Sequence, residues 1–314
     1  YKDFEMEYSD KKMVFANAQY SYTFNTLNIY PFEKFLENKN SKYLKWLKEF
    51  NFNPLPNSLT FSGNFNRSLF KQKFREINYA GIISENQIPI PEFTQSKFMF
   101  DWLLSISHNL SKSLILNYNA SNSSLIPSFT KDVNTTDRNR LELFEKFFNV
   151  GDPNFYNQNF TANYNLPISN FPFLDFINAN YSYNGNFNWQ RGSDILNNVS
   201  DQFGNKLGRV NTIQNSNNQT LNIALNLDRL YRQINFSNNN FLFDFLTSLK
   251  RVRSTYSENS GKVLPGYIPS IGFLGTLKPS FGFVFGSQKD VRYEIAKNGW
   301  LTTFNDFNQQ FQKV

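Results

Sequence analysis

A strict alternation of apolar and polar residues recurs along this chain and limits its possible folds more than any other feature. The clearest example covers residues 177–189, where aromatic or small apolar residues alternate with Asn and Ser. Successive side chains of a β-strand point to opposite faces, so such a strand has one apolar and one polar face. The alternating segments are about as long as the ~9 to 11 residues that a tilted strand needs to cross a bilayer. The pattern therefore predicts membrane-crossing strands.

The alternation predicts strands near residues 13–25, 59–69, 97–107, 113–122, 159–166, 176–189, 219–228 and 279–286. Between them, apolar residues at helical spacing predict helical inserts near 33–50, 140–148 and 240–252. Such helices either cap the rim of a barrel or dock a partner protein or the membrane surface. Residues 254–267, with Gly261, Pro265 and Gly266, are expected to form a loop. We therefore predict an all-β fold, in which residues 1–314 form a segment of one large antiparallel transmembrane β-barrel with short helices in its connecting loops.

In such a barrel the polar residues of each strand face the lumen and the apolar residues face lipid or form an aromatic girdle at the membrane interface. The expected lumen-facing residues are Asn17, Gln19, Ser21, Asn64, Asn66, Asn163, Asn178, Asn180, Ser182, Asn184 and Asn186. The expected lipid-facing or girdle residues are Tyr20, Tyr22, Phe24, Phe61, Phe65, Tyr181, Tyr183, Phe187, Trp189, Phe281, Phe283 and Phe285.

A soluble β-sandwich also has alternating strands, with one face on a core and the other in water. Composition favours the membrane fold. The chain has 36 Phe and 16 Tyr, yet a mean hydropathy of −0.51 because neutral polar residues alternate with them. Sandwich surfaces usually carry Lys, Glu and Thr, whereas here the polar positions are mostly Asn and Ser, and charged residues gather between the strands. Ordered rows of aromatic residues in water would also form large apolar patches.

Two further sequence observations concern targeting. No segment approaches the ~18 to 20 consecutive apolar residues of a membrane-spanning helix, which argues against a helical membrane protein. The first residues, YKDFEMEYSDKK, lack the basic, apolar and small-residue regions of a signal peptide. We therefore expect the sequence to be a trimmed chain or a fragment of a bacterial outer-membrane protein.

No catalytic or metal-binding constellation is visible. The chain has no Cys and a single histidine, His108, which we interpret as an interfacial or turn residue. We expect no enzyme activity, no cofactor and no metal. The net charge of +7 is spread over turns and helices without a long basic run, so nucleic acid is not an expected partner. A lumen of neutral Asn, Ser and Thr side chains would let a hydrated solute or a polypeptide pass without strong electrostatic selection.

Three stretches resemble the SprA/Sov outer-membrane translocons of the type IX secretion system. They are NFNPLPNSLTFSGNFNRS from Asn51, FEKFFNVGDPNFYNQNF from Phe144 and KVLPGYIPSIGFLGTLKPSFGFVFGSQKDVRYEIAKNGWLT from Lys262. The resemblance extends over most of the chain, and the last stretch is its most specific part.

The resemblance implies a function in protein secretion and gliding motility. In this family the chain would be one sector of a giant outer-membrane pore, completed by the remainder of the same chain. Folded cargo proteins with a C-terminal secretion signal would pass through it, and a PorV-type barrel and a periplasmic plug protein would be its partners. Two alternatives remain: an outer-membrane transporter or porin-type barrel for small solutes, and a soluble all-β adhesin or structural module.

Overall fold

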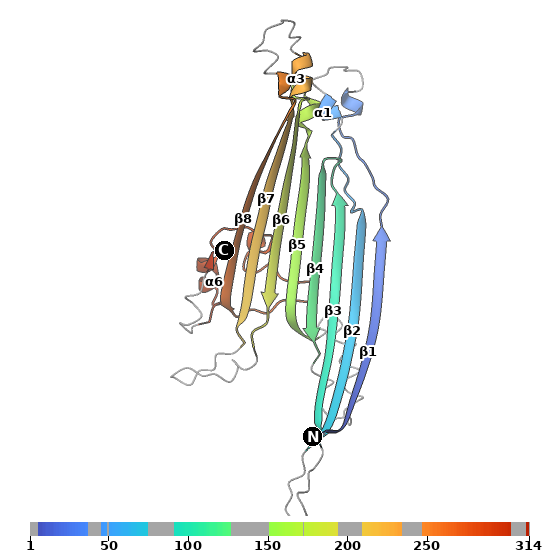
Figure 1. Ribbon diagram of the computed structural model, residues 1–314, viewed down its shortest axis with the longest axis vertical. Coiled ribbons are helices and arrows are strands. Elements are labelled where there is room, and N and C mark those ends of the chain that lie inside the picture. The colour runs from blue at the N-terminus through green and yellow to red at the C-terminus, as the bar shows by residue number, and fades with distance from the viewer. Residues whose placement is uncertain are drawn as a thin grey trace, which may run out of the picture.

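The computed structural model describes residues 6–36, 45–48, 50–74, 91–126, 151–171, 173–193, 209–233, 247–302 and 312–313. They form a nine-stranded antiparallel sheet in which each strand pairs with the next strand in the sequence (Figure 1). The strands are β1 (Met6–Thr23), β2 (Ser58–Phe74), β3 (Phe93–Asn109), β4 (Leu114–Leu125), β5 (Asp152–Leu166), β6 (Ile177–Gln190), β7 (Asn211–Asn226), β8 (Arg251–Tyr267) and β9 (Gln312–Lys313). Among these residues the sheet is open, with β1 at one edge and β8 and the short β9 at the other.

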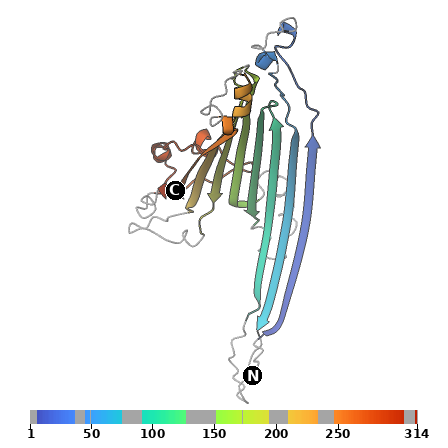
Figure 2. The same ribbon diagram turned by 45° about the horizontal axis from the view of Figure 1, so that its top comes forward.

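The observed strands agree with the alternation in the sequence. Each strand predicted before residue 229 overlaps one of β1 to β7, and most of the observed strands are longer than predicted. Figure 2 shows that β1, β2 and β3 extend beyond the lower ends of the other strands. Their extensions carry charged residues, including Asp10, Lys12 and Lys71. Period-two alternation of apolar residues ends before these charges, which is why the prediction stopped short.

The strand predicted at 279–286 is wrong. This stretch contains the short helix α5 (Phe281–Val284), whose first turn is capped by Ser280: its side-chain oxygen accepts a hydrogen bond from the backbone N–H of Phe283. Gly286 then takes a positive φ of 92°, the backbone conformation in which glycine often ends a helix. The serine and glycine that bracket the aromatic residues decided the local structure, whereas the spacing of the aromatics alone suggested a strand.

The loop predicted at 254–267 is also wrong, because these residues belong to β8. Pro265 and Gly266 lie near the end of the strand, where the pairing with β7 shifts register. Proline has no N–H to donate and is tolerated on an edge strand, and among the described residues β8 has only the two-residue β9 on its outer side. The polar sequence RVRSTYSENS therefore pairs as a strand although it lacks an apolar face.

The connecting segments contain short helices, as expected. The insert predicted near 33–50 contains the 3₁₀ turn η1 (Lys34–Leu36) and α1 (Lys45–Lys48), and η5 (Pro167–Asn170) follows β5. The insert predicted near 140–148 lies outside the described residues, and β8 begins inside the one predicted near 240–252. The sequence analysis missed α3 (Leu227–Gln233) and α6 (Arg292–Lys297). None of the helices in the described ranges has the length and apolar character needed to span a bilayer.

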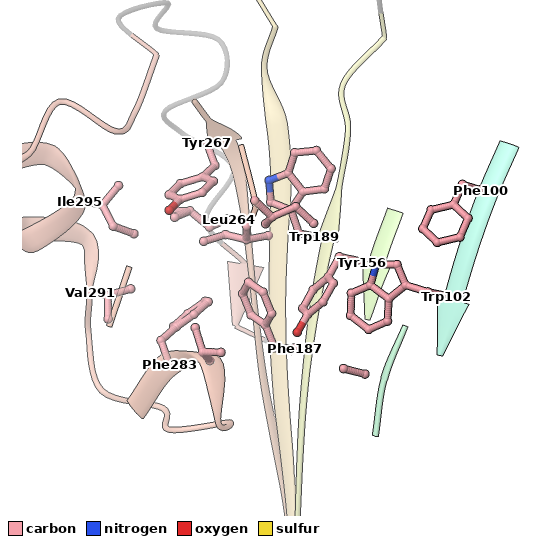
Figure 3. Packing of buried hydrophobic residues seen from close by; sticks show 14 of the residues in the cluster. Phe100, Trp102, Tyr156, Phe187, Trp189, Leu264, Tyr267, Phe283, Val291 and Ile295 are labelled. Atoms are coloured by element: carbon pink, nitrogen blue, oxygen red, sulfur yellow. The ribbon is translucent and has the colours of Figure 1, made fainter. Parts of the chain in front are cut away.

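Within the described ranges, the hydrophobic core lies on one side of the sheet. We call this side the aromatic face; it bears Tyr20, Phe61, Trp102, Phe160 and Phe187, which the strand register places on the same side. After β8 the chain folds back onto this face, and we call residues 268–302 the docked segment. Figure 3 shows Phe283, Val291 and Ile295 of this segment opposite sheet residues such as Phe187.

Candidate functional site

The opposite side of the sheet, which we call the polar face, is lined mainly by amide and hydroxyl side chains across β1 to β8, although apolar residues such as Phe15 and Leu103 also lie on it. The strand register places every residue that was expected to face a lumen on this side. They are Asn17, Gln19, Ser21, Asn64, Asn66, Asn163, Asn178, Asn180, Ser182, Asn184 and Asn186. The segregation of these residues onto one continuous face follows from unbroken antiparallel pairing, because a slip of one residue in any strand would move its polar set to the other side.

Neighbouring strands are linked on the polar face by side-chain hydrogen bonds. The Asn159 amide donates to Asn184 and Asn186 at 2.7 Å each, so one β5 residue contacts two β6 residues. Similar bonds join β1 to β2, β3 to β4, β5 to β6 and β7 to β8: Asn17 to Asn64, Ser21 to Thr60 at 3.1 Å, Ser105 to Asn119 at 2.6 Å, Ser182 to Asn163 at 2.7 Å and Thr255 to Asn222 at 2.8 Å. Asn is a poor strand former, and these cross-strand bonds compensate for it.

The polar face is nearly neutral. Few of its positions are charged; among them, Asp101 lies near the middle of β3, and Arg251 and Arg253 lie at the start of β8. Beyond the alternating part of the sheet, just before β3, Glu92 accepts a hydrogen bond from the Tyr8 hydroxyl at 3.0 Å and lies 3.4 Å from Lys71, which the register places on the aromatic face. The hydrogen bond from Tyr8, followed by the attraction of Lys71, lowers the pKa of the Glu92 carboxyl. A solute moving along the polar face would thus meet hydrogen-bonding groups without a strong fixed field.

The aromatic face is uncovered over β1 and β2. The side chains of Tyr20 and Tyr22 are 60% and 49% exposed, and Phe65 is 38% exposed although its ring stacks on Phe100 with centroids 4.5 Å apart. Between Val14 and Tyr22, the residues of β1 on this face are all apolar or aromatic. The length of this apolar stretch matches the thickness of a bilayer crossed by a tilted strand.

The docked segment covers part of the aromatic face, from β3, where Phe273 packs against Trp102, to β8, and it binds the sheet through its backbone carbonyls. The Asn215 amide donates to the carbonyls of Phe283 at 3.1 Å and Ser287 at 2.8 Å, and the Asn217 amide donates to that of Gly286 at 2.8 Å. Further donors from the sheet are Gln158 to Val284, Tyr183 to Phe285, Trp189 to Pro269, Asn211 to Ile268 and Lys262 to Gln288. These donors replace the backbone hydrogen bonds that an irregular segment cannot make with itself.

The docked segment corrects part of the lipid-facing prediction. Phe187 and Trp189 are 0% and 2% exposed, because α5 and the stretch after β8 lie over them. Tyr183 is half-buried by its hydrogen bond to the Phe285 carbonyl, and Phe283 is fully buried. Phe187, Trp189 and Phe283 are thus buried within the protein, and Tyr183 is partly so.

The remaining residues of that prediction are not covered in this way. Tyr20, Tyr22, Phe61, Phe65 and Tyr181 lie on the aromatic face, partly or largely exposed. Phe24 follows the end of β1 and its ring packs edge-on against Tyr22 with centroids 4.6 Å apart, while Phe281 is 65% exposed at the outer surface of the docked segment. Phe285 packs against Phe160 and Tyr118 with centroids 5.5 and 6.2 Å apart.

The sequence analysis missed the polar residues that hold the docked segment. Gln158, Asn215, Asn217 and Lys262 occupy positions of the aromatic face that the alternation would assign to apolar residues. One signal was available: between Asn211 and Gln219 the only large apolar residue of β7 is Ile213, so the alternation fails there because the aromatic face also carries polar residues. A failure of alternation within a long strand can mark the docking of another segment.

Helix α6 carries the charged part of the docked segment. The Arg292 guanidinium donates to both oxygens of Asp290, at 2.6 Å in the shortest contact, and the Arg292 backbone N–H donates to Asp290 as well. These hydrogen bonds lower the pKa of the Asp290 carboxyl to about 2. Ile295, on the inner side of α6, is fully buried, while Tyr293 is 79% exposed.

In the described ranges, no cluster of three or more His, Asp or Glu side chains could hold a metal ion. His108 lies near the end of β3, where its Nε2 is 2.8 Å from the Asn53 carbonyl oxygen of a loop. No known protein family and no curated protein matches this sequence.

Proposed function

We propose that this chain is a sector of a protein-conducting pore of the bacterial outer membrane, which exports folded proteins carrying a C-terminal secretion signal in type IX secretion and gliding motility. The observation that carries the proposal is the continuous neutral polar face of β1 to β8, opposite a face whose uncovered part is apolar. A sheet of this kind separates lipid from a hydrated lumen. That the exported cargo consists of folded proteins with a C-terminal secretion signal is inferred from the resemblance to the SprA/Sov translocons.

The open edges of the sheet favour the interpretation that this chain is one part of a larger barrel over the interpretation that it forms a small complete barrel. Along Met6–Thr23, β1 pairs only with β2 among the described residues, and β8 pairs on its outer side only with β9 at Lys262 and Val263. Long unpaired edges invite non-specific strand pairing, so natural sheets cover or close them. We propose that further strands of the same giant chain pair with these edges, and that a wide pore results because barrel diameter grows with strand number.

The two edge strands differ in the polarity of the residues that they place on the aromatic face. On β1 this face is apolar from Val14 to Tyr22, whereas on β8 it carries Ser254, Glu258 and Ser260. A carboxylate at a lipid-facing position is costly. We therefore propose that lipid contacts the uncovered aromatic face from β1 toward β7, and that β8 faces water, an adjoining strand or a partner such as a PorV-type barrel.

The proposal is tested by depleting the protein and following its cargo. Loss of a secretion pore leaves signal-bearing proteins in the periplasm, while outer-membrane porins and their solute uptake stay normal. Immunoblots of fractionated cells with an antibody against this region complete the test. An outer-membrane band many times heavier than 36.8 kDa is expected for a giant chain. Normal secretion after depletion would overturn the pore.

A small-solute transporter or porin-type barrel is the second candidate. The same neutral polar face would suit small polar solutes. It predicts a band near 36.8 kDa in the outer membrane and a defect in solute uptake without retention of cargo. A band in the soluble fraction would instead fit a soluble adhesin or structural module.

A further inference from the structure

The outer surface of the docked segment exposes three large apolar side chains, which we call the apolar ridge. Leu274, Leu277 and Phe281 are 64%, 63% and 65% exposed, more than the Tyr and Phe residues of the uncovered aromatic face. They belong to one short stretch that carries no acidic residue between Ile268 and Phe281. Exposed apolar clusters of this kind need a covering surface.

The ridge is continuous with the aromatic face of β4 and β5. The Phe281 ring lies 4.6 Å from that of Phe285, which in turn packs against Phe160 and Tyr118 of the sheet. On the inner side, Phe273 packs against Trp102 of β3 with ring centroids 5.5 Å apart. A surface that contacts the exposed part of the aromatic face at β4 and β5 would therefore also contact the ridge.

The inner backbone carbonyls of the docked segment are hydrogen-bonded by the sheet and do not depend on water. Beneath the ridge, irregular backbone carbonyls accept hydrogen bonds from Gln158, Asn215, Asn217, Tyr183 and Trp189 of the sheet. Irregular backbone is tolerated at membrane depth where such polar groups are satisfied by protein. The segment can therefore lie against lipid without leaving these buried carbonyls unsatisfied.

Exposed basic residues flank the ridge. Lys278 follows Leu277 directly, and its ammonium lies 5.1 Å from the centroid of the Trp300 ring. Lys289 and Lys297 are exposed near and on α6, where Asp290 is paired with Arg292 and Glu294 is also exposed. An apolar surface bordered by lysines, with a tryptophan beside one of them, matches the boundary between acyl chains and anionic headgroups in hydrophobicity and in charge.

We propose that the docked segment is a lipid-contacting cover on the outside of the barrel wall, with Leu274, Leu277 and Phe281 among acyl chains and the lysines around α6 at the phosphates of anionic lipids. The proposal rests on the proposed function only in requiring that the sheet be embedded in a membrane. It assigns to the segment after β8 the role of extending the lipid-facing surface over a part of the sheet whose own residues are too polar for lipid.

The test measures the depth of single labelled positions in the full-length protein reconstituted into vesicles of phosphatidylethanolamine and phosphatidylglycerol. An environment-sensitive fluorophore is attached at Leu277→Cys or Phe281→Cys, and quenching by acyl-brominated lipid is compared with quenching by aqueous iodide. Tyr22→Cys on the uncovered aromatic face serves as the membrane control and Asn119→Cys on the polar face as the water control. Tyr293→Cys, exposed on α6, reports the headgroup region within the same segment.

We expect Leu277→Cys and Phe281→Cys to be quenched by brominated lipid as strongly as Tyr22→Cys, several-fold more than Asn119→Cys, and Tyr293→Cys to be intermediate. Quenching of Tyr22→Cys without quenching of the ridge would overturn the lipid cover and leave the membrane sheet intact. Protection of the ridge from both quenchers would also overturn it, because the covering surface would then be protein. Absence of lipid quenching at all positions would contradict the membrane sheet as well.

Discussion

The docked segment meets the sheet where two glycines face each other. A Cβ added to Gly286 would lie 2.9 Å from the Cα of Gly185, and one added to Gly185 would lie 2.3 Å from the Phe285 carbonyl oxygen. Real Cβ atoms do not approach backbone this closely, so the turn that follows α5 can lie on β6 only because both positions lack a side chain. The pair therefore fixes how deeply the segment is seated.

We predict that Gly286→Ala weakens the docking of the segment. The substitution combines a non-glycine residue at a φ of 92° with overlap on the sheet, and we expect a loss of about 3 kcal/mol in the free energy of opening. Hydrogen exchange at the amides of residues 284–287 measures this opening. Gly299→Ala is the matched control, because φ there is also positive at 66° but nothing lies within 4 Å of the added Cβ, so only the left-handed cost of about 1 kcal/mol remains. Equal losses in the two variants would contradict the Gly185–Gly286 contact.

The Asn215 amide is predicted to anchor the docked segment. It is 3% exposed and donates to two carbonyls, so Asn215→Ala leaves both without this donor and should cost about 1–3 kcal/mol. Thermal unfolding of the purified protein, with hydrogen exchange over residues 283–287, gives the global and local effects. Asn218→Ala, three residues further along β7 and exposed on the polar face, should change stability by less than about 0.5 kcal/mol. A larger effect at Asn218 than at Asn215 would exclude the anchoring role.

The contact between Asp290 and Arg292 predicts a pH response at the start of α6. Because hydrogen bonds from Arg292 lower the pKa of Asp290 to about 2, this contact contributes stability fully above the ordinary carboxyl pKa of about 3.9 and loses it as the pH falls toward 2. Hydrogen exchange in the first turn of α6, corrected for the intrinsic pH dependence, should remain slow at pH 3. In Arg292→Gln the pKa of Asp290 returns toward its ordinary value, and protection should already be falling near pH 4. Identical profiles in both proteins would refute the assignment.

The sequence predicted the sheet better than the segment that packs on it. Antiparallel strands with different residues on their two faces follow from period-two alternation, and residues such as Tyr181 and Asn184 therefore fall on the expected sides. The docked segment could not be predicted, because its contacts are irregular backbone carbonyls that leave no periodic signal. Phe281, Phe283 and Phe285 illustrate the limit: their spacing suits a strand, while the cap at Ser280 and the turn at Gly286 produced a helix.

The burial of Phe187 and Trp189 could not be predicted from the sequence for the same reason, because the docked segment that covers them leaves no periodic signal. Within β6 nothing distinguishes these two residues from an aromatic girdle, since the segment that covers them lies about eighty or more residues further along the chain, at Pro269 and Phe283. The neighbouring strand β7 held the useful signal, in the amides at Asn215 and Asn217. Polar residues on an otherwise apolar strand face are hydrogen-bonded when they are buried, so they indicate a covering segment.

The measurement that tests the pore most directly is site-specific photo-crosslinking of cargo during export. A photoreactive amino acid is placed at Asn119 or Asn180 on the polar face, and at Tyr20 on the aromatic face, in the full-length protein of secreting cells. If the polar face lines a protein-conducting lumen, a cargo protein that carries the C-terminal signal and is stalled by a fused, slowly passing domain forms adducts with both polar positions and not with Tyr20. Absence of cargo adducts at Asn119 and Asn180, or equal adducts at Tyr20, would contradict the account.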